Sequence, residues 1–155
     1  MKKIKNLIIC LTIPLVTGLL SGYLTADEVK IYDELVLPAF APPGWVFGPA
    51  WIFLYLMMGY ASYRIWKKRY NYNVKNSLSY YGIQLIFNFF WTIIFFGLGL
   101  RGFAFLEILI LLILIIVTTI KFYDIDKISA YMMFPYIIWV SFAAVLNYSI
   151  WILNI

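Results

Sequence analysis

The sequence predicts an all-α membrane protein, a bundle of five transmembrane helices, and three observations predict it. First, 65% of the 155 residues are hydrophobic and 12% are charged, with a mean hydropathy of +0.90, well outside the range of soluble domains. Second, the apolar residues form five segments, each long enough to cross a hydrocarbon core of roughly 30 Å. Third, the basic residues alternate between the ends of these segments. We expect a single domain over residues 1–155, with spans at about 7–24, 45–63, 78–100, 102–120 and 128–153.

The basic residues divide ten to two between the two ends of the expected spans. Only Lys30 and Arg101 lie in the first and third connections. By the positive-inside rule, the N-terminus is cytoplasmic and the C-terminus external. The net charge of +5 therefore indicates orientation in a lipid membrane and does not predict binding to nucleic acid.

The residue counts exclude several kinds of chemistry. One cysteine, Cys10, and no histidine exclude a zinc site, a disulfide, a Cys-His pair and a histidine-ligated haem. We expect no metal and no cofactor. The N-terminus also fits a secretory signal peptide cut near Thr25, but Ser21-Gly22-Tyr23 is a poor cleavage site, which favours a retained span.

Two features of the spans concern packing and charge. Gly18 and Gly22 lie four residues apart, a spacing that lets helices approach closely, either within the bundle or in a homodimer. Glu107 lies inside the fourth span, where a carboxylate is costly unless it is paired or protonated. We expect an ion pair, with Arg101 as a candidate, or a hydrogen bond to a neighbouring helix; a proton relay is the alternative.

The first connection ends in a rigid, aromatic stretch, P-A-F-A-P-P-G-W-V-F-G-P-A-W at residues 38–51. Proline fixes φ and removes an amide donor, so a helix can begin only at or just after Pro43. We expect residues 25–44 to form an external lid over a pocket, with a plain solvated connector as the alternative. Pro43 is then a candidate pocket residue.

Two later spans carry candidate pocket faces. Gln84, Asn88, Trp91 and Phe95 form one helical stripe, which serves either interhelical hydrogen bonding or a polar contact to an apolar ligand. In the fifth span, helical spacing puts Trp139 on the same face as Ala143, Leu146 and Ile150.

Three stretches together resemble one family. Residues 38–51, I-F-N-F-F-W at 86–91 and P-Y-I-I-W-V-S-F-A-A-V-L-N-Y at 135–148 are similar to the translocator protein, or tryptophan-rich sensory protein, family. The similarity runs in order along essentially the whole chain, and the chain resembles bacterial members. The resemblance implies a multi-pass protein of the bacterial cell membrane, often dimeric, that binds porphyrins and other flat hydrophobic ligands.

The resemblance also implies particular site residues. Ligand contacts of the family match Tyr32, Trp51, Asn88, Trp139, Ala143 and Leu146. Bacterial members are associated with light- and oxygen-dependent breakdown of protoporphyrin IX, in which Trp51 and Trp139 would take a photochemical part. Pro43 and Trp91 complete the expected ligand-binding set.

The chain departs from the family pattern at two places. Phe40 stands where the family has a tryptophan. After Tyr148 there is no basic residue, so the sterol-recognition pattern is absent and sterol transport is not expected. The sequence thus predicts porphyrin binding in tetrapyrrole sensing or degradation; the alternatives are a transporter of tetrapyrroles or other amphiphiles and a non-catalytic, partner-binding membrane protein.

Overall fold

The computed structural model describes residues 2–26 and 28–155, which are helical in most of their length and contain no strand. Five stretches are long and apolar enough to cross a membrane, which confirms the predicted five-helix membrane fold. The helices are α1 (Lys2–Leu24), α2 (Phe47–Lys67), α3 (Lys75–Thr92), α4 (Arg101–Tyr123), α5 (Lys127–Tyr131) and α6 (Phe134–Leu153), with short helical turns η1 (Glu28–Glu34), η2 (Gly44–Val46) and η3 (Ile93–Gly97).

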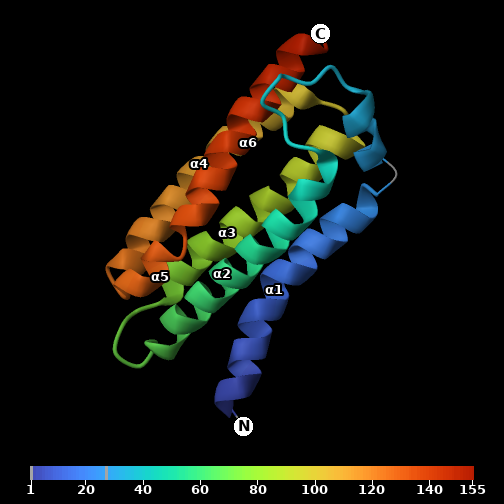
Figure 1. Ribbon diagram of the computed structural model, residues 1–155. Coiled ribbons are helices and arrows are strands. Elements are labelled where there is room, and N and C mark those ends of the chain that lie inside the picture. Colours follow the sequence, from blue (N-terminus) through green and yellow to red (C-terminus); the bar gives the residue numbers. More distant parts are fainter. Residues whose placement is uncertain (1, 27) are drawn as a thin grey trace.

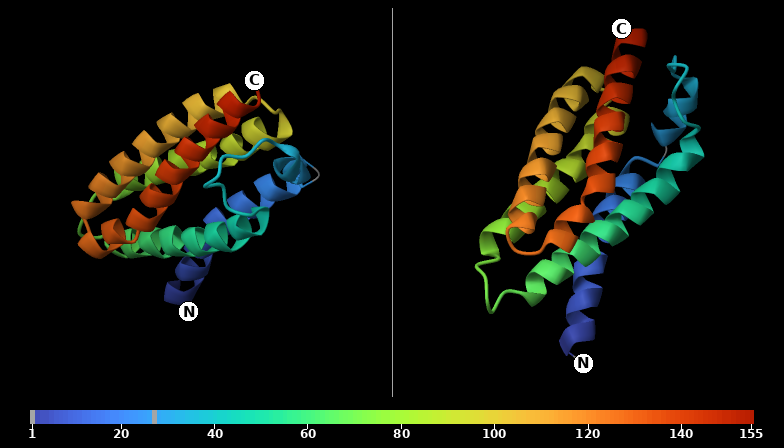
Figure 2. Two further views of the ribbon diagram at one scale, coloured as in Figure 1. Left: turned by 45° about the horizontal axis from the view of Figure 1, so that its top comes forward. Right: turned by 60° about the vertical axis from the view of Figure 1, so that its left-hand side comes forward.

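The long helices run side by side, and the two termini lie at opposite ends of the bundle (Figure 1), as an odd number of spans requires. Helix α1 packs on α2 and α3, and α4 packs on α3 and α6. Helix α2 contacts α5 and α6, so the helices close into a ring in the order α1, α2, α5 with α6, α4 and α3 (Figure 2). The segment between α1 and α2 covers one end of this ring.

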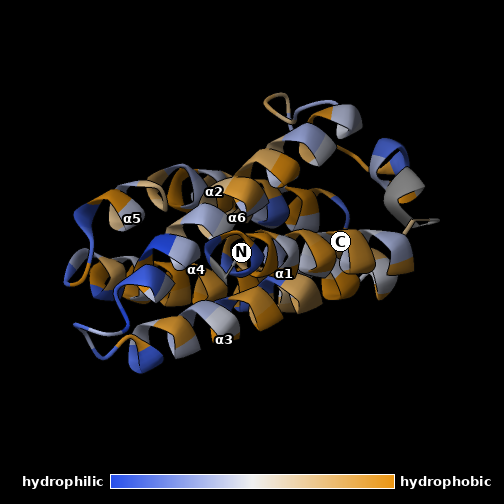
Figure 3. Ribbon diagram, turned by 90° about the horizontal axis from the view of Figure 1, so that it is seen from below, coloured by the Kyte–Doolittle hydropathy of each residue, from blue (hydrophilic) through white to orange (hydrophobic). Residues whose placement is uncertain are grey.

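Apolar side chains lie both inside and outside the bundle. Tyr136, Phe122 and Met58 are among the largest fully buried side chains, while large aliphatic residues such as Leu19 and Ile138 are exposed. Viewed from the end where the N-terminus lies, hydrophilic residues gather mainly at helix ends and connections (Figure 3). An apolar outer surface of this kind is stable only against lipid.

The helix bounds differ from the predicted ones where charges or proline intervene. Helix α2 continues to Lys67 and α3 begins at Lys75, because long basic side chains can reach polar surroundings from within a helix. The fifth span is broken between α5 and α6, where Pro135 occupies the first turn of α6 and its ring nitrogen offers no hydrogen to the preceding helix. The start of the second helical stretch agrees with prediction, since η2 begins at Gly44, directly after Pro43.

Two glycines allow close packing between α1 and α2. A Cβ atom on Gly18 would lie 2.0 Å from the Tyr55 ring, and one on Gly59 would lie 2.7 Å from the Cys10 carbonyl oxygen. A Cβ atom on Gly22 would meet nothing within 4 Å. Gly18 therefore serves packing within the chain, whereas a homodimer through these glycines stays a prediction.

Candidate ligand-binding site

A cluster of aromatic rings lies beneath the segment that joins α1 to α2. Trp51 stacks on Tyr55, with ring centroids 5.5 Å apart, and meets Tyr136 and Trp139 edge-on at 6.1 and 6.5 Å. Phe47 contacts Trp139 at 6.0 Å. These residues lie one or two helical turns apart on α2 and α6, so each helix presents its rings on one face.

The rings separate two cavities. The first, of about 240 Å³, lies between α1, α2 and the end of α3, and its aromatic lining includes Tyr32, Phe47, Trp51, Tyr55 and Trp91. Four glycines also line it: Gly18 and Gly22 from α1, and Gly44 and Gly48 from the start of the second helical stretch. Small residues at these positions leave space that larger side chains would fill.

The second cavity is a groove of about 600 Å³ on the other side of the rings, between α2 and α6. Trp139, Phe142 and Pro42 line it together with aliphatic side chains. The indole nitrogen of Trp139 is buried and has no hydrogen-bond partner in the described part of the chain. Because this nitrogen is buried, the indole N–H is not accessible from the groove, whose wall is apolar.

Tyr32 closes the first cavity from above. Its side chain is only 3% exposed, its ring meets Phe47 edge-on at 5.3 Å, and its hydroxyl donates to the Pro42 carbonyl at 3.0 Å. Burial, and secondarily the charge of Asp33, raise the pKa of Tyr32 above its ordinary value, so the hydroxyl stays neutral and able to donate.

The segment between α1 and α2, predicted to be a lid, is also held to the end of α6. The Asn154 side-chain amide accepts from the Val36 backbone N–H and donates to the Val36 carbonyl, each at 3.0 Å. This paired contact joins residues 118 positions apart. The segment over the cavity is thereby attached to the bundle at both Tyr32 and Val36.

Asn88 lies in a buried polar network. Its Oδ1 accepts from the Tyr55 hydroxyl at 2.6 Å and its Nδ2 donates to the Tyr136 hydroxyl at 3.0 Å. Tyr136 in turn donates to Gln84 Oε1 at 2.9 Å. Of the two roles that the sequence left open for the α3 stripe, interhelical hydrogen bonding is the one observed. The sequence analysis did not identify Tyr55 and Tyr136 as partners of Asn88. The signal for Tyr55 is its position one helical turn after Trp51, which puts the two rings on one face of α2.

The predicted site residues separate into two groups. Tyr32, Trp51 and Trp91 line the first cavity and Trp139 lines the groove. Asn88, Ala143 and Leu146 are buried in the core, and Pro43 is exposed; none of these four lines either cavity. Their role as ligand contacts stays a prediction.

Trp91 is held by its own hydrogen bond. Its indole nitrogen donates to Asn147 Oδ1 at 3.1 Å, and Asn147 Nδ2 donates to the Arg101 carbonyl at 2.8 Å. The chain Trp91–Asn147–Arg101 links α3, α6 and the start of α4. The indole N–H of Trp91 is therefore already used within the bundle.

The expectation of a paired Glu107 is wrong. Within residues 2–26 and 28–155, both carboxylate oxygens of Glu107 are buried without a hydrogen-bond partner, and the Nε atom of Arg101 is likewise unpartnered. Six residues along an α-helix turn the chain by roughly 240° beyond a full turn, so Arg101 and Glu107 project from different sides of α4.

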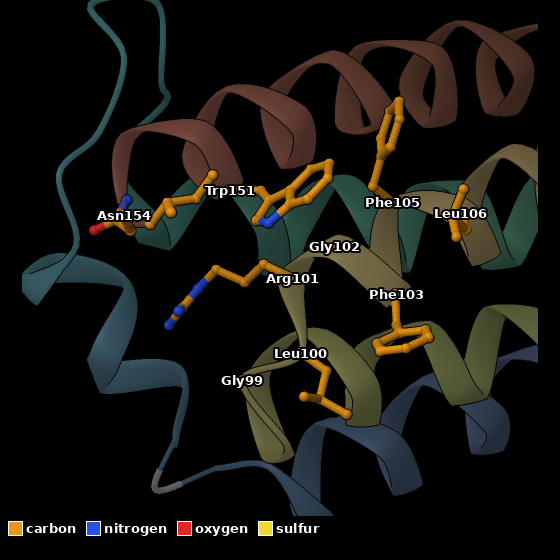
Figure 4. A pocket seen from close by; sticks show the side chains of 10 residues that line it. Gly99, Leu100, Arg101, Gly102, Phe103, Phe105, Leu106, Trp151 and Asn154 are labelled. Atoms are coloured by element: carbon orange, nitrogen blue, oxygen red, sulfur yellow. The ribbon is translucent and has the colours of Figure 1, made fainter.

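A third recess lies where α4 begins and α6 ends. It measures about 640 Å³, and Figure 4 shows Arg101 extending away from Trp151 within it. A Cβ atom on Gly102 would lie 2.9 Å from the Trp151 ring, so glycine is needed for this indole to pack on α4. The recess is separate from the aromatic cluster under the lid.

The fold and the site together define a five-helix integral membrane protein with an aromatic cavity beneath the segment that joins its first two spans. A model of the TspO/MBR family matches residues 10–152. The chain belongs to this family, as the sequence resemblance predicted. The family assignment rests on the whole bundle, because the match covers all five spans.

Relatives from distant organisms agree with the assignment. The chain is 35% identical over 133 residues to the translocator protein of Homo sapiens, covering 84% of this chain and 79% of the relative. It is 34% identical over 158 residues to the tryptophan-rich protein TspO of Chlorobaculum tepidum, covering 99% and 98%. It is 36% identical over 124 residues to protein CrtK of Rhodobacter capsulatus, covering 79% and 78%.

Proposed function

We propose that this membrane protein binds protoporphyrin IX or a similar flat hydrophobic ligand under its first connection, and acts in tetrapyrrole sensing or in light- and oxygen-dependent porphyrin degradation. The observation that supports the proposal is the position of Trp51, which lies against three other aromatic rings and borders the first cavity. Indole and phenol rings stack well on a planar macrocycle.

The size of the cavity indicates how a ligand would enter. At about 240 Å³, the first cavity is smaller than the roughly 300–1,000 Å³ typical of ligand sites. The groove beyond the rings is larger, at about 600 Å³. A macrocycle would therefore be accommodated by moving Trp51 and Phe47, which separate the two spaces, so that the cavity and the groove join.

The two tryptophans also suit a photochemical role. Trp51 and Trp139 have ring centroids 6.5 Å apart, close enough for both to contact one ligand. An illuminated porphyrin generates oxidising species, and indoles are oxidisable without any acid, base or metal. We expect the oxidation to fall on these two side chains.

The test is an absorbance titration of the purified protein with protoporphyrin IX. Trp51→Phe and Trp139→Phe should each weaken binding about three- to tenfold, because each removes part of a stacking contact. Gly48→Leu should weaken binding further, since Gly48 lines the cavity and a Cβ atom there meets no other atom within 4 Å, so the leucine side chain can extend into the cavity. In light with oxygen, bound porphyrin should lose absorbance in the wild type, more slowly in the double tryptophan variant, and not in the dark.

The matched control is Gly82→Leu, which adds the same side chain to α3 at another open position outside the cavity. It should leave porphyrin affinity unchanged. Equal affinity in the wild type, both tryptophan variants and Gly48→Leu would overturn the proposal.

A further inference from the structure

Asn147 of α6 is a buried amide that contacts a wall residue of the first cavity. Its side chain is 1% exposed, and it lines neither the first cavity nor the groove beside Trp139. Trp91, to which it is hydrogen-bonded, does line the first cavity. Any effect of Asn147 on a ligand in that cavity must therefore act through a neighbour such as Trp91.

Two hydrogen bonds of opposite kind fix the orientation of this amide. The Trp91 indole N–H can only donate, and the Arg101 carbonyl can only accept. Asn147 satisfies both, because its Oδ1 accepts from Trp91 at 3.1 Å and its Nδ2 donates to Arg101 at 2.8 Å. An amide turned by half a rotation would present the wrong atom to each partner, so the two partners favour a single orientation of the Asn147 side chain.

The Arg101 carbonyl is itself held in place by helix packing. Arg101 is the first residue of α4, and the next residue, Gly102, lies against Trp151, one helical turn after Asn147 on α6 (Figure 4). A Cβ atom on Gly102 would lie 2.9 Å from the Trp151 ring, which shows how closely α4 and α6 approach here. Asn147 therefore holds the Trp91 indole of α3 in a fixed position relative to both helices.

Trp91 in turn supports the α3 side of the first cavity. Its ring stacks on Phe95, with ring centroids 5.3 Å apart, and meets Phe96 edge-on at 6.2 Å. Trp91, Thr92 and Phe96 are the residues by which α3 and η3 line the cavity. A change in the position of the Trp91 ring would therefore alter this side of the cavity.

We propose that Asn147 is a positioning residue of the ligand site, because its hydrogen bond fixes the Trp91 ring against which a flat aromatic ligand packs. The inference rests on the proposed porphyrin binding. The Trp91 indole N–H stays bonded to Asn147 when the ligand is present, so Trp91 contributes packing and no hydrogen bond to the ligand. A side chain already held in its bound position favours binding, since less conformational freedom is lost when the ligand arrives.

The test is a double-mutant cycle on the purified protein, measured by absorbance titration with protoporphyrin IX. Asn147→Leu should weaken binding about fivefold in the wild type, since one hydrogen bond no longer holds the indole. In Trp91→Phe, which has no N–H to hold, Asn147→Leu should change affinity by less than about twofold. Tm should fall in both backgrounds, because both lose the donor to the Arg101 carbonyl.

The matched control is Thr118→Val, which removes a buried hydroxyl elsewhere in the bundle. Thr118 is 0% exposed, and its hydroxyl donates to the Leu114 carbonyl of its own helix. It lines neither the first cavity nor the groove. Thr118→Val should therefore leave porphyrin affinity unchanged.

Hydrogen exchange of the indole N–H groups, followed by NMR in detergent, reports the contact directly. The Trp91 signal is the one that is missing in Trp91→Phe. It should exchange at least about tenfold more slowly than the signal of Trp45, whose side chain is 76% exposed, both without and with protoporphyrin IX. Asn147→Leu should accelerate the exchange of the Trp91 N–H.

The outcomes separate this role from porphyrin binding itself. Equal affinity in the wild type and a folded Asn147→Leu, or an equal loss of affinity in the Trp91→Phe background, overturns the role of Asn147 and leaves porphyrin binding standing. A wild type that binds no porphyrin overturns both. Should Asn147→Leu not fold, the exchange measurement decides: a Trp91 N–H that exchanges as fast as that of Trp45 with porphyrin bound overturns the role, and a protected one supports it.

Discussion

At the scale of single residues, Asp126 joins three parts of the chain at the end of the bundle opposite the lid. Its carboxylate caps α5 by accepting from the Ser129 backbone N–H at 3.0 Å. It also accepts from Arg64 Nε at 2.8 Å and lies 3.0 Å from Lys68 Nζ. Burial raises the pKa of Asp126, but hydrogen bonds from Arg64, Ser129 and Lys68 outweigh burial and hold the pKa well below the ordinary value of 3.8.

Asp126→Asn should therefore destabilise the protein near neutral pH. The amide keeps the helix cap but loses the ion pairs, and we expect a cost of about 2 kcal/mol, because the Arg64 and Lys68 side chains are partly exposed. That corresponds to a fall in Tm of roughly 4–8 °C, measured by thermal unfolding in detergent at pH 7.

The pH dependence has a definite sign. Because the folded-state pKa of Asp126 is lowered, its stabilisation is complete above about pH 4 and is lost as the pH falls below that value. As the pH is lowered below about 4, the Tm of the wild type should fall toward the Tm of the Asp126→Asn variant. The exposed neighbour Asp124 supplies the control: Asp124→Asn should change Tm by less than 2 °C, and an equal loss in both variants would contradict this role for Asp126.

At the scale of helices, the contact of α1 with α2 depends on Gly59. A Cβ atom there would lie 2.7 Å from the Cys10 carbonyl oxygen and 3.0 Å from the Leu11 Cα, and backbone atoms cannot move aside as a flexible side chain can. Gly59→Val should separate the two helices at a cost of about 1–3 kcal/mol, seen as a lower Tm. Gly82→Ala, at an open helical position, should keep or slightly raise Tm; an equal fall in both would show that helix separation is not the cause.

At the scale of the whole molecule, Asn154 connects the end of α6 to the segment between α1 and α2, which lies over the first cavity. Its paired contact with Val36 can be tested by hydrogen–deuterium exchange. Asn154→Ala should speed amide exchange across residues 31–43 by about five- to tenfold, because one backbone N–H loses its acceptor and the segment is less restrained. Asn73→Ala, in the connection between α2 and α3, is the control and should leave amide exchange across residues 31–43 unchanged. Unaltered exchange at Val36 in Asn154→Ala would show that the contact does not restrain this segment.

The sequence alone determined that this is a membrane protein of five helical spans and where the second helical stretch begins. These properties depend on contiguous hydropathy, on the alternation of basic residues and on Pro43, all of which are local along the chain. The three sequence stretches at 38–51, 86–91 and 135–148 were enough to predict the family. Tyr32, Trp51 and Trp91, which the sequence predicts as ligand contacts, line one cavity, and their contact with a ligand stays a prediction.

Only the tertiary structure decided how the side chains of different helices meet. It paired Asn88 with Tyr55 and Tyr136 inside the bundle and left the carboxylate of Glu107 without a partner in the described residues. It also placed Trp139 on a groove separate from the first cavity. Such contacts depend on the rotation of each helix about its axis and on its neighbours. Periodicity along one helix specifies which residues share a face, but it does not specify what that face meets.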